Sequence, residues 1–333
     1  MSSGHGAWES RIEIGRQSGL GTAPTNWHVL PIDSADSLTF GPQMADRKPV
    51  YGGRTRPETS YRKDHELPAG GLGDWAVLMD ESSHGFLRVL DMFYQHSAVV
   101  TSGTTAPADW TFQPLGTFTA STSLHTYGIQ KAVGDGGTRD ERYLDCIGDT
   151  LSWKHSTGNP LMLTLGMRSL SGTNLTISAT GSTLLGVPLA TPEIVERLTI
   201  NGTSFAVYPS SSGCNESNNL VDSTGAGAAQ RQRHVIGGHS GDISMTLPRN
   251  SVLAAVQNAY NNNYTGTFLM TLRPSTGTYS YGGGTLSASY TAYIRFDRPD
   301  APAGGDGELT WELTGQIVGA PVWTLQSIVG SIT

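Results

Sequence analysis

One pattern occurs twice in this chain, as SHGFLRVLDMFY at residues 83–94 and as NSVLAAVQNAY at residues 250–260. In each stretch the apolar side chains follow one another at spacings of 1, 3, 3 and 1 residues, which places them on one face of an α-helix. A Ser or Asn at the start of each stretch suits the N-cap of that helix. The two sets are offset by 166 residues: Phe86, Leu87, Leu90, Phe93 and Tyr94 in the first, and Val252, Leu253, Val256, Ala259 and Tyr260 in the second. The sequence therefore predicts two equivalent amphipathic helices, each packed against a sheet.

The segments before the helices also follow one plan. A strand, a loop of about thirty residues and a second strand precede each helix, and both loops are longer than ordinary connections. In the first half these segments are the strand Ser37–Phe40, the loop Gly41–Gly71 and the strand Trp75–Met79. In the second half they are the strands Arg197–Ile200 and Phe205–Tyr208, the loop Pro209–Gly238 and the strand Asp242–Leu247.

Alternating apolar and polar residues follow each helix, which is typical of strands with one buried face. These predicted strands are Trp110–Leu115, Leu124–Lys131, Tyr143–Trp153 and Leu161–Met167 in the first half, and Phe268–Leu272, Ser287–Phe296 and Glu308–Ile317 in the second. With 42 Gly and only 15% charged residues, the chain is expected to be mainly β with two short helices. A length of 333 residues suits two domains, each large enough for its own core. We therefore predict an N-terminal arm at 1–26, a first β module at 27–190 and a second at 191–333.

The arm and the two long loops are expected to mediate contacts. The arm is rich in Gly and Ser and is predicted to have little core of its own. The loop Gly41–Gly71 mixes both charges and carries two tyrosines, which suits a contact surface. A disordered insertion is the alternative interpretation of this loop, and the weakly charged Pro209–Gly238 is harder to interpret.

Charge argues against tight nucleic-acid binding. The formal net charge is −7, with 14 basic and 18 acidic residues before position 191 and 7 basic and 10 acidic residues after it. Neither half has the Lys/Arg excess that neutralises phosphates. Cys146 and Cys214 lie in different halves, so we expect free thiols in a reducing cytoplasm. The start of the chain lacks an apolar signal region and no run of eighteen apolar residues occurs, so no membrane contact is expected.

Signals of catalysis are weak. The chain has no strand–GxGxxG–helix order, no phosphate-binding P-loop and no HExxH. His234 and His239 lie in a Gly-rich loop at a spacing that matches no usual metal site. Ser83, His84 and Asp80 could be imagined as a triad, but helix capping explains them better. We therefore predict a non-enzymatic protein without cofactor or metal.

Several runs resemble the tail tube proteins of long-tailed bacteriophages. The runs in the first half are ELPAGGLGDW at 66–75, GFLRVL at 85–90, YGI at 127–129 and YLDCIGDTLSW at 143–153. The second half adds ERLTINGT at 196–203, the strand 241–247, the second helix and GDGEL at 305–309. The resemblance spans residues 20–325 and is one of elements and turns, with no single invariant motif.

The resemblance implies a fold and an assembly. Each module would be a β-sandwich or partial barrel flanked by a helix and a long loop, and the sheets of neighbouring subunits would join into a ring. Single-module members form six-fold rings, so a duplicated chain would close a pseudo-six-fold ring as a trimer. The long loop would reach the next ring, with contacts from Arg47, Lys48, Tyr51, Arg54, Arg56, Tyr61 and Arg62. Strands near Tyr143–Met167 and Ser287–Ile317 would build the inner wall of the tube.

The implied partners are further copies of the chain, a tape measure protein, a tail terminator and distal tail proteins, in a virion tail assembled in the host cytoplasm. DNA would pass through without specific binding, since a trimer carries three times the net charge of −7 and acids in the bore repel phosphates. Candidates for these acids are Asp140, Glu141, Asp145, Asp149, Asp297, Asp306, Glu308 and Glu312. For any one of them, an ordinary solvated position is an equal alternative.

Two other functions stay open at this point. One is a different ring-forming tail protein, such as a terminator or baseplate component. The other is a carbohydrate-binding β-sandwich, which rests on Gly/Ser/Thr/Asn richness and seven Trp.

Overall fold

The chain is mainly β in a computed structural model, with two helices among the described residues. The structure describes residues 11–30, 42–46, 61–66, 69–76, 84–95, 97–101, 108–116, 124–132, 140–157, 159, 161–174, 177, 192–223, 233–248, 251–274, 280–281, 284–285, 287–299 and 310–327. The expected mainly β class is confirmed. The predicted strand Ser37–Phe40 lies outside these ranges.

Strands of the first half form an antiparallel sheet in the order β1–β8–β9–β10–β5. Their bounds are Arg11–Arg16 for β1, Tyr127–Ala132 for β8, Glu141–Ser156 for β9, Met162–Arg168 for β10 and Ala69–Ala76 for β5. Two short strands flank this set: β2 (His28–Leu30) pairs with β1, and β11 (Ser171–Asn174) pairs with the start of β9. Strand β5 thus begins before the predicted Trp75–Met79 and overlaps it only in part.

Strands of the second half repeat this order as β12–β18–β21–β22–β17. Their bounds are Pro192–Ile200 for β12, Thr265–Pro274 for β18, Ala288–Phe296 for β21, Thr310–Ile317 for β22 and Ser240–Pro248 for β17. Strand β13 (Thr203–Val207) flanks β12 as β2 flanks β1, and β23 (Val322–Ser327) pairs with the start of β21 as β11 pairs with the start of β9. The duplicated plan therefore covers eight elements in each half: seven strands with the same order of pairing, and one helix.

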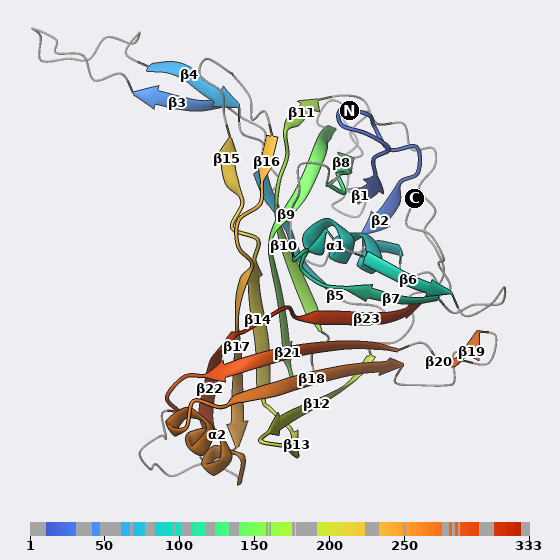
Figure 1. Ribbon diagram of the computed structural model, residues 1–333. Coiled ribbons are helices and arrows are strands. Elements are labelled where there is room, and N and C mark those ends of the chain that lie inside the picture. Colours follow the sequence, from blue (N-terminus) through green and yellow to red (C-terminus); the bar gives the residue numbers. More distant parts are fainter. Residues whose placement is uncertain are drawn as a thin grey trace, which may run out of the picture.

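The helices α1 (His84–Tyr94) and α2 (Ser251–Asn261) lie within one residue of their predicted bounds. Helix α2 is amphipathic as expected, because Val252, Val256 and Ala259 are buried while Gln257 is exposed. Helix α1 differs, since every side chain from Phe86 to Tyr94 is buried, including those of the charged residues on its opposite face. It packs between strands of the first half, whereas α2 lies at the far end of the second half (Figure 1).

Both segments predicted as long loops, Gly41–Gly71 and Pro209–Gly238, contain strands, so the prediction that each is a loop throughout is wrong. The first holds the hairpin β3 (Pro42–Asp46) and β4 (Tyr61–Glu66), which extends away from the main body (Figure 1). The second holds the hairpin β15 (Val221–Ser223) and β16 (Arg233–Val235), and also β14 (Ser211–Ser217). The composition of β14 is typical of turns, because it has small polar residues. It nevertheless forms a strand because it pairs with β9 on one side and β17 on the other.

The predicted N-terminal arm is wrong for residues 11–16. Strand β1 pairs with β8 over its whole length, and Ile12 and Ile14 are buried in the core. Two β-branched apolar residues on alternate positions are enough to bury one face of a short strand.

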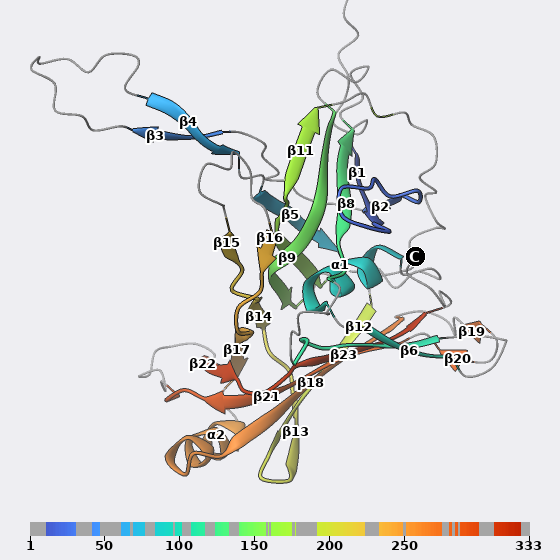
Figure 2. The same ribbon diagram turned by 45° about the horizontal axis from the view of Figure 1, so that its top comes forward.

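The sheet continues across the sequence boundary at residue 190, so the two halves share one core. Strand β9 pairs with β14, and β7 (Ala108–Phe112) pairs with both β23 and β6 (Ser97–Thr101). Seventeen of the described strands belong to this sheet, which bends so that two sets of strands cross at a steep angle (Figure 2). A small hairpin, β19 (Ser280–Tyr281) and β20 (Gly284–Thr285), lies apart from it.

Aromatic side chains from both halves meet where the sets of strands cross. Trp153 of β9 stacks on Phe268 of β18 at 6.0 Å and contacts the edge of Tyr290 at 5.7 Å. Trp323 of β23 then joins Tyr290 to Phe86 of α1, at 5.0 and 5.4 Å between ring centroids. Such pairs add about 0.5–1.5 kcal/mol each beyond their burial, so they hold the halves as one body.

Candidate functional site

Four adjacent strands, β9, β14, β17 and β22, expose one continuous face of small polar side chains. Alternation sends Leu151, Trp153, Ile243 and Leu313 into the core and the residues between them outward. We call the outward set the polar face. It consists of Thr150, Ser152, Lys154 and Ser156 on β9, Ser211, Gly213, Asn215 and Ser217 on β14, Ser240, Asp242, Ser244 and Thr246 on β17, and Thr310, Glu312, Thr314 and Gln316 on β22.

The strand register aligns these side chains in rows across the sheet. One row runs Ser152, Asn215, Asp242, Gln316, and the next runs Lys154, Gly213, Ser244, Thr314. Neighbours within a row bond to one another, as Asn215 donates to Asp242 at 3.3 Å and Ser211 donates to Thr246 at 3.1 Å. Hydroxyl and amide groups therefore satisfy each other along the face while remaining open to water.

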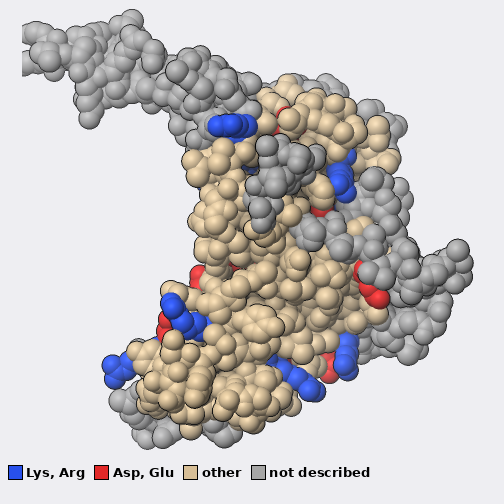
Figure 3. Space-filling view, in the orientation of Figure 1, with Lys and Arg blue, Asp and Glu red and all other residues tan. Residues whose placement is uncertain are grey.

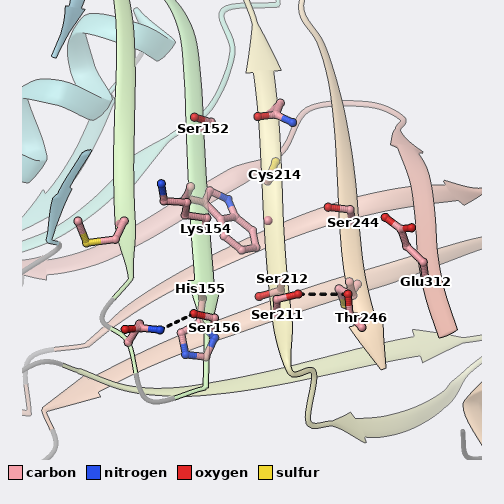
Figure 4. Close-up of a pocket in the computed structure, with 16 residues that line it drawn as sticks. Ser152, Lys154, His155, Ser156, Ser211, Ser212, Cys214, Ser244, Thr246 and Glu312 are labelled. Carbon is pink, nitrogen blue, oxygen red and sulfur yellow. Dashed lines mark hydrogen bonds between the residues drawn. The ribbon is translucent and has the colours of Figure 1, made fainter. Parts of the chain in front are cut away.

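The polar face is hollowed. Two adjoining grooves of about 640 and 670 Å³ run along it and share Ser152 and Asn215. Figure 4 shows side chains of β9, β14, β17 and β22 reaching into the first of these grooves. Among the described residues that line either groove, Trp153 is the only Trp, Tyr or Phe, and just 2% of it is exposed.

Charges on the polar face are few and nearly balanced. Its sixteen positions hold one cation, Lys154, and two acids, Asp242 and Glu312. Lys and Arg form separate small patches on the surface in Figure 3, with large uncharged areas between them. A phosphate backbone gains affinity by neutralisation, and this face offers little of it.

The predicted lumen acids of the first half mostly serve internal contacts. Asp140 and Asp145 are only 3% and 5% exposed, which leaves them no carboxylate surface toward a bore. Asp140 accepts a hydrogen bond from the Ile177 amide, and Asp145 accepts from Gln17 and the Gly21 amide. The prediction that these two residues line a bore is therefore corrected. Their carboxylates act inside the protein as hydrogen-bond acceptors, which buried backbone N–H groups need.

The remaining predicted acids are dispersed. Asp149 forms an ion pair with Arg168 at 2.7 Å, and Glu141 accepts from the Tyr143 hydroxyl. Asp297 is exposed just after β21, and Glu312 belongs to the polar face. Asp306 and Glu308 lie outside the described residues.

The predicted inter-ring residues cannot be placed by side chain. Tyr61 and Arg62 begin β4, and their side chains lie outside the described set. Arg47, Lys48, Tyr51, Arg54 and Arg56 also lie outside it, between β3 and β4 in the sequence.

A buried carboxylate that the sequence did not mark joins the halves behind the polar face. Glu216 accepts from the hydroxyls of Tyr94 at 2.8 Å and Tyr290 at 2.9 Å. His239 lies at ion-pair distance from it, 3.1 Å, without hydrogen-bond alignment. We call Glu216, Tyr94, Tyr290 and His239 the junction cluster. Burial, and then the charge of Glu216, raises the pKa of Tyr94 well above its ordinary value, so the phenol remains a donor.

A second buried carboxyl group, that of Glu196, has a raised pKa. Glu196 of β12 is 4% exposed and accepts from the Ser212 hydroxyl at 2.6 Å, while its other oxygen, Oε2, has no hydrogen-bond partner among the described residues. Burial raises the pKa of Glu196 to about 7. This side chain is therefore partly protonated at neutral pH.

Neither protein-family models nor curated proteins match this chain. Among the described residues, no group of three or more His, Cys, Asp or Glu could hold a metal ion. His234 and His239 do not converge, because His234 contacts the Asp145 carbonyl and His239 contacts Glu216. None of the described helices has the length and apolar character needed to span a bilayer.

Proposed function

We propose that this chain is a structural subunit of a phage tail tube, which assembles with copies of itself into stacked rings around a conduit for DNA. The observation that carries the proposal is the strand order, β1–β8–β9–β10–β5, repeated as β12–β18–β21–β22–β17. Two equivalent units in one continuous sheet would occupy two adjacent places in a ring of six. Three chains would then close the ring.

The polar face supports the conduit role. A wall that DNA must pass without sticking needs few cations and groups that exchange hydrogen bonds freely with water. Ser, Thr and Asn side chains meet that need, and one Lys among sixteen positions offers little phosphate neutralisation. The face draws on strands of both halves, so duplication would make it broad and continuous.

The proposal includes the partners that the sequence resemblance implies: a tape measure protein, a terminator and distal tail proteins, in the tail of a virion. A terminator or baseplate ring would use the same modules, and it would form single rings in place of tubes. Carbohydrate binding has less support, because sugar rings stack on exposed aromatic side chains and the grooves expose almost none.

Negative-stain electron microscopy of the purified, concentrated protein tests the proposal. We expect hollow tubes or stacked rings, with ring averages showing three copies of a two-lobed unit. Single rings that never stack would support the terminator or baseplate alternative. A compact monomer at all concentrations and salt conditions would contradict the proposal, and saturable binding on a glycan array would support the carbohydrate alternative.

A further inference from the structure

The two helices are counterparts in the repeat, yet they are covered differently. In the register of the two apolar sets, Tyr94 at the end of α1 corresponds to Tyr260 near the end of α2. Tyr94 is 1% exposed, whereas Tyr260 is 43% exposed. The same type of residue at equivalent positions is therefore buried in the first half and open to solvent in the second.

The second half of the chain covers the end of α1. Glu216 of β14 accepts a hydrogen bond from the Tyr94 hydroxyl at 2.8 Å. Asn218 donates to the Phe93 carbonyl oxygen at 2.6 Å, and the ring of His239, which precedes β17, lies 5.9 Å from the Phe93 ring. The end of α1 is thus part of the joint between the two halves.

The end of α2 has the composition of a contact surface. It lies at the far end of the second half, and its exposed residues include Asn261 and Tyr264 besides Tyr260 (Figure 1). Residues 251–264 contain no Lys, Arg, Asp or Glu, although the solvent face of a helix usually carries charged residues. The centres of protein–protein contacts are depleted of Lys, Glu and Asp and enriched in Tyr. The end of α2 therefore suits contact with a protein surface.

The repeat identifies that protein surface. Strand β14 and the start of β17 bring Glu216 and His239 to α1, and β17 is the counterpart of β5 in the strand order of the two halves. A second copy of the chain would therefore bring its first half, on the side of β5, to the end of α2. Each chain has one such helix end and one such side, so copies would join head to tail.

We propose that the end of α2, centred on Tyr260, docks against the first half of a second copy of this chain. The contact repeats between chains the joint that Tyr94 makes within one chain. It rests on the proposed function for its place, between neighbours in one ring, and it goes further by naming the helix that joins them.

Gln257 lies outside the proposed contact, although it is exposed on the same helix. Its counterpart is Asp91, which contacts His125 of its own half at 2.9 Å. Because the first half itself covers Asp91, the repeat assigns no contact from a second copy to position 257. Gln257 is therefore the matched control for Tyr260.

Sedimentation velocity of the full chain over a range of concentrations measures the association. We expect the native chain to form dimers and larger species. Tyr260→Arg should raise the dissociation constant about tenfold or more, because it places a charge where a Tyr ring is to be buried. Gln257→Arg should associate as the native chain does. Both positions are exposed, so both variants should fold, and circular dichroism with thermal melting checks this.

The outcomes separate this proposal from the tube. Tubes that form equally well from the native chain and from Tyr260→Arg would overturn the α2 contact and leave the proposed function standing. Open chains of subunits that depend on Tyr260 but never form tubes would support the contact and contradict the proposed function. Equal weakening by Tyr260→Arg and Gln257→Arg, or a native chain that stays monomeric at every concentration, would overturn the contact.

Discussion

Glu196 makes the stability of this protein depend on pH. Its pKa is about 7 in the folded chain and 4.5 when unperturbed, so the folded state resists ionisation. Below about pH 4.5 the Glu196 carboxyl is protonated in both the folded and the unfolded chain, so it does not lower the unfolding free energy. As pH rises from 4.5 to 7, burial of the ionised group lowers the unfolding free energy by a growing amount. Above pH 7 this loss reaches about 3 kcal/mol, because each unit between the two pKa values of Glu196 corresponds to roughly 1.4 kcal/mol.

Glu196→Gln should therefore flatten the dependence of unfolding free energy on pH between pH 5 and 8. Urea denaturation at several pH values measures the unfolding free energy. The unfolding free energy of the variant should rise relative to that of the native chain as pH rises. The matched control is Glu193→Gln, an exposed position on the same strand, which should leave the pH dependence unchanged. An identical pH profile for Glu196→Gln and the native chain would count against a shifted Glu196.

The junction cluster gives a second prediction at the scale of single residues. Tyr290→Phe keeps the ring contacts with Trp153 and Trp323 but removes a hydroxyl that donates to buried Glu216. Because the carboxylate then loses a donor inside the core, we expect a loss of about 1.5–3 kcal/mol in unfolding free energy.

Tyr293→Phe is the matched control for that change, since Tyr293 lies on the same strand and is 52% exposed. It should alter the urea midpoint very little. Equal effects of the two substitutions would show that the Tyr290 hydroxyl contributes nothing specific to the junction.

At the scale of elements, the pattern of apolar residues predicted most of the structure. Helices α1 and α2 and the strands after them follow from apolar spacing, because each buries one face locally. The turn Asn201–Gly202 between β12 and β13 is also local: both residues have positive φ, 47° and 78°, as a tight hairpin turn requires.

Elements that depend on distant partners escaped prediction. The small polar residues of strand β14 predict a turn, but the segment forms a strand because it pairs with β9 and β17. The full burial of α1 was not predicted either, because it too depends on residues that are distant in the sequence. Asp91 on its polar side is satisfied by His125 and Tyr127, more than thirty residues away. The junction cluster spans both halves, so no short-range spacing could reveal it.

The β3–β4 hairpin gives a prediction for one element. Replacing residues 47–60 by Asn-Gly keeps both strands and joins them through a two-residue turn. If this hairpin joins one ring to the next, the variant should fold normally and fail to form tubes. Circular dichroism and thermal melting check the fold, and electron microscopy checks assembly. Tubes of normal length from this variant would remove the hairpin from the ring contacts.

At the scale of the whole molecule, shared packing makes the two halves one unit. Strand β9 of the first half pairs with β14 of the second, and both lie in the polar face. In the proposed tube, this continuity would give each chain an inner wall with no gap between its two halves. The sequence predicted two modules but could not predict this continuity, which depends on pairing between residues that lie 55 to 67 positions apart in the chain.

The direction in which the polar face points can be tested with a single new thiol. Cys146 and Cys214 are buried, and burial raises the pKa of Cys146 to about 12 and that of Cys214 well above its usual value, so neither reacts readily. Ser244→Cys places a reactive thiol in the polar face, and Gln257→Cys places one on the exposed side of α2.

Both thiols should react quickly with a bulky polyethylene glycol maleimide in unassembled subunits. In assembled tubes we expect the thiol at position 244 to be protected, because the reagent must enter a narrow bore, while the thiol at position 257 stays reactive. A gel that separates labelled from unlabelled chains measures both rates. Equal labelling of position 244 before and after assembly would place the polar face on the outside of the tube and remove its role as the wall of the conduit.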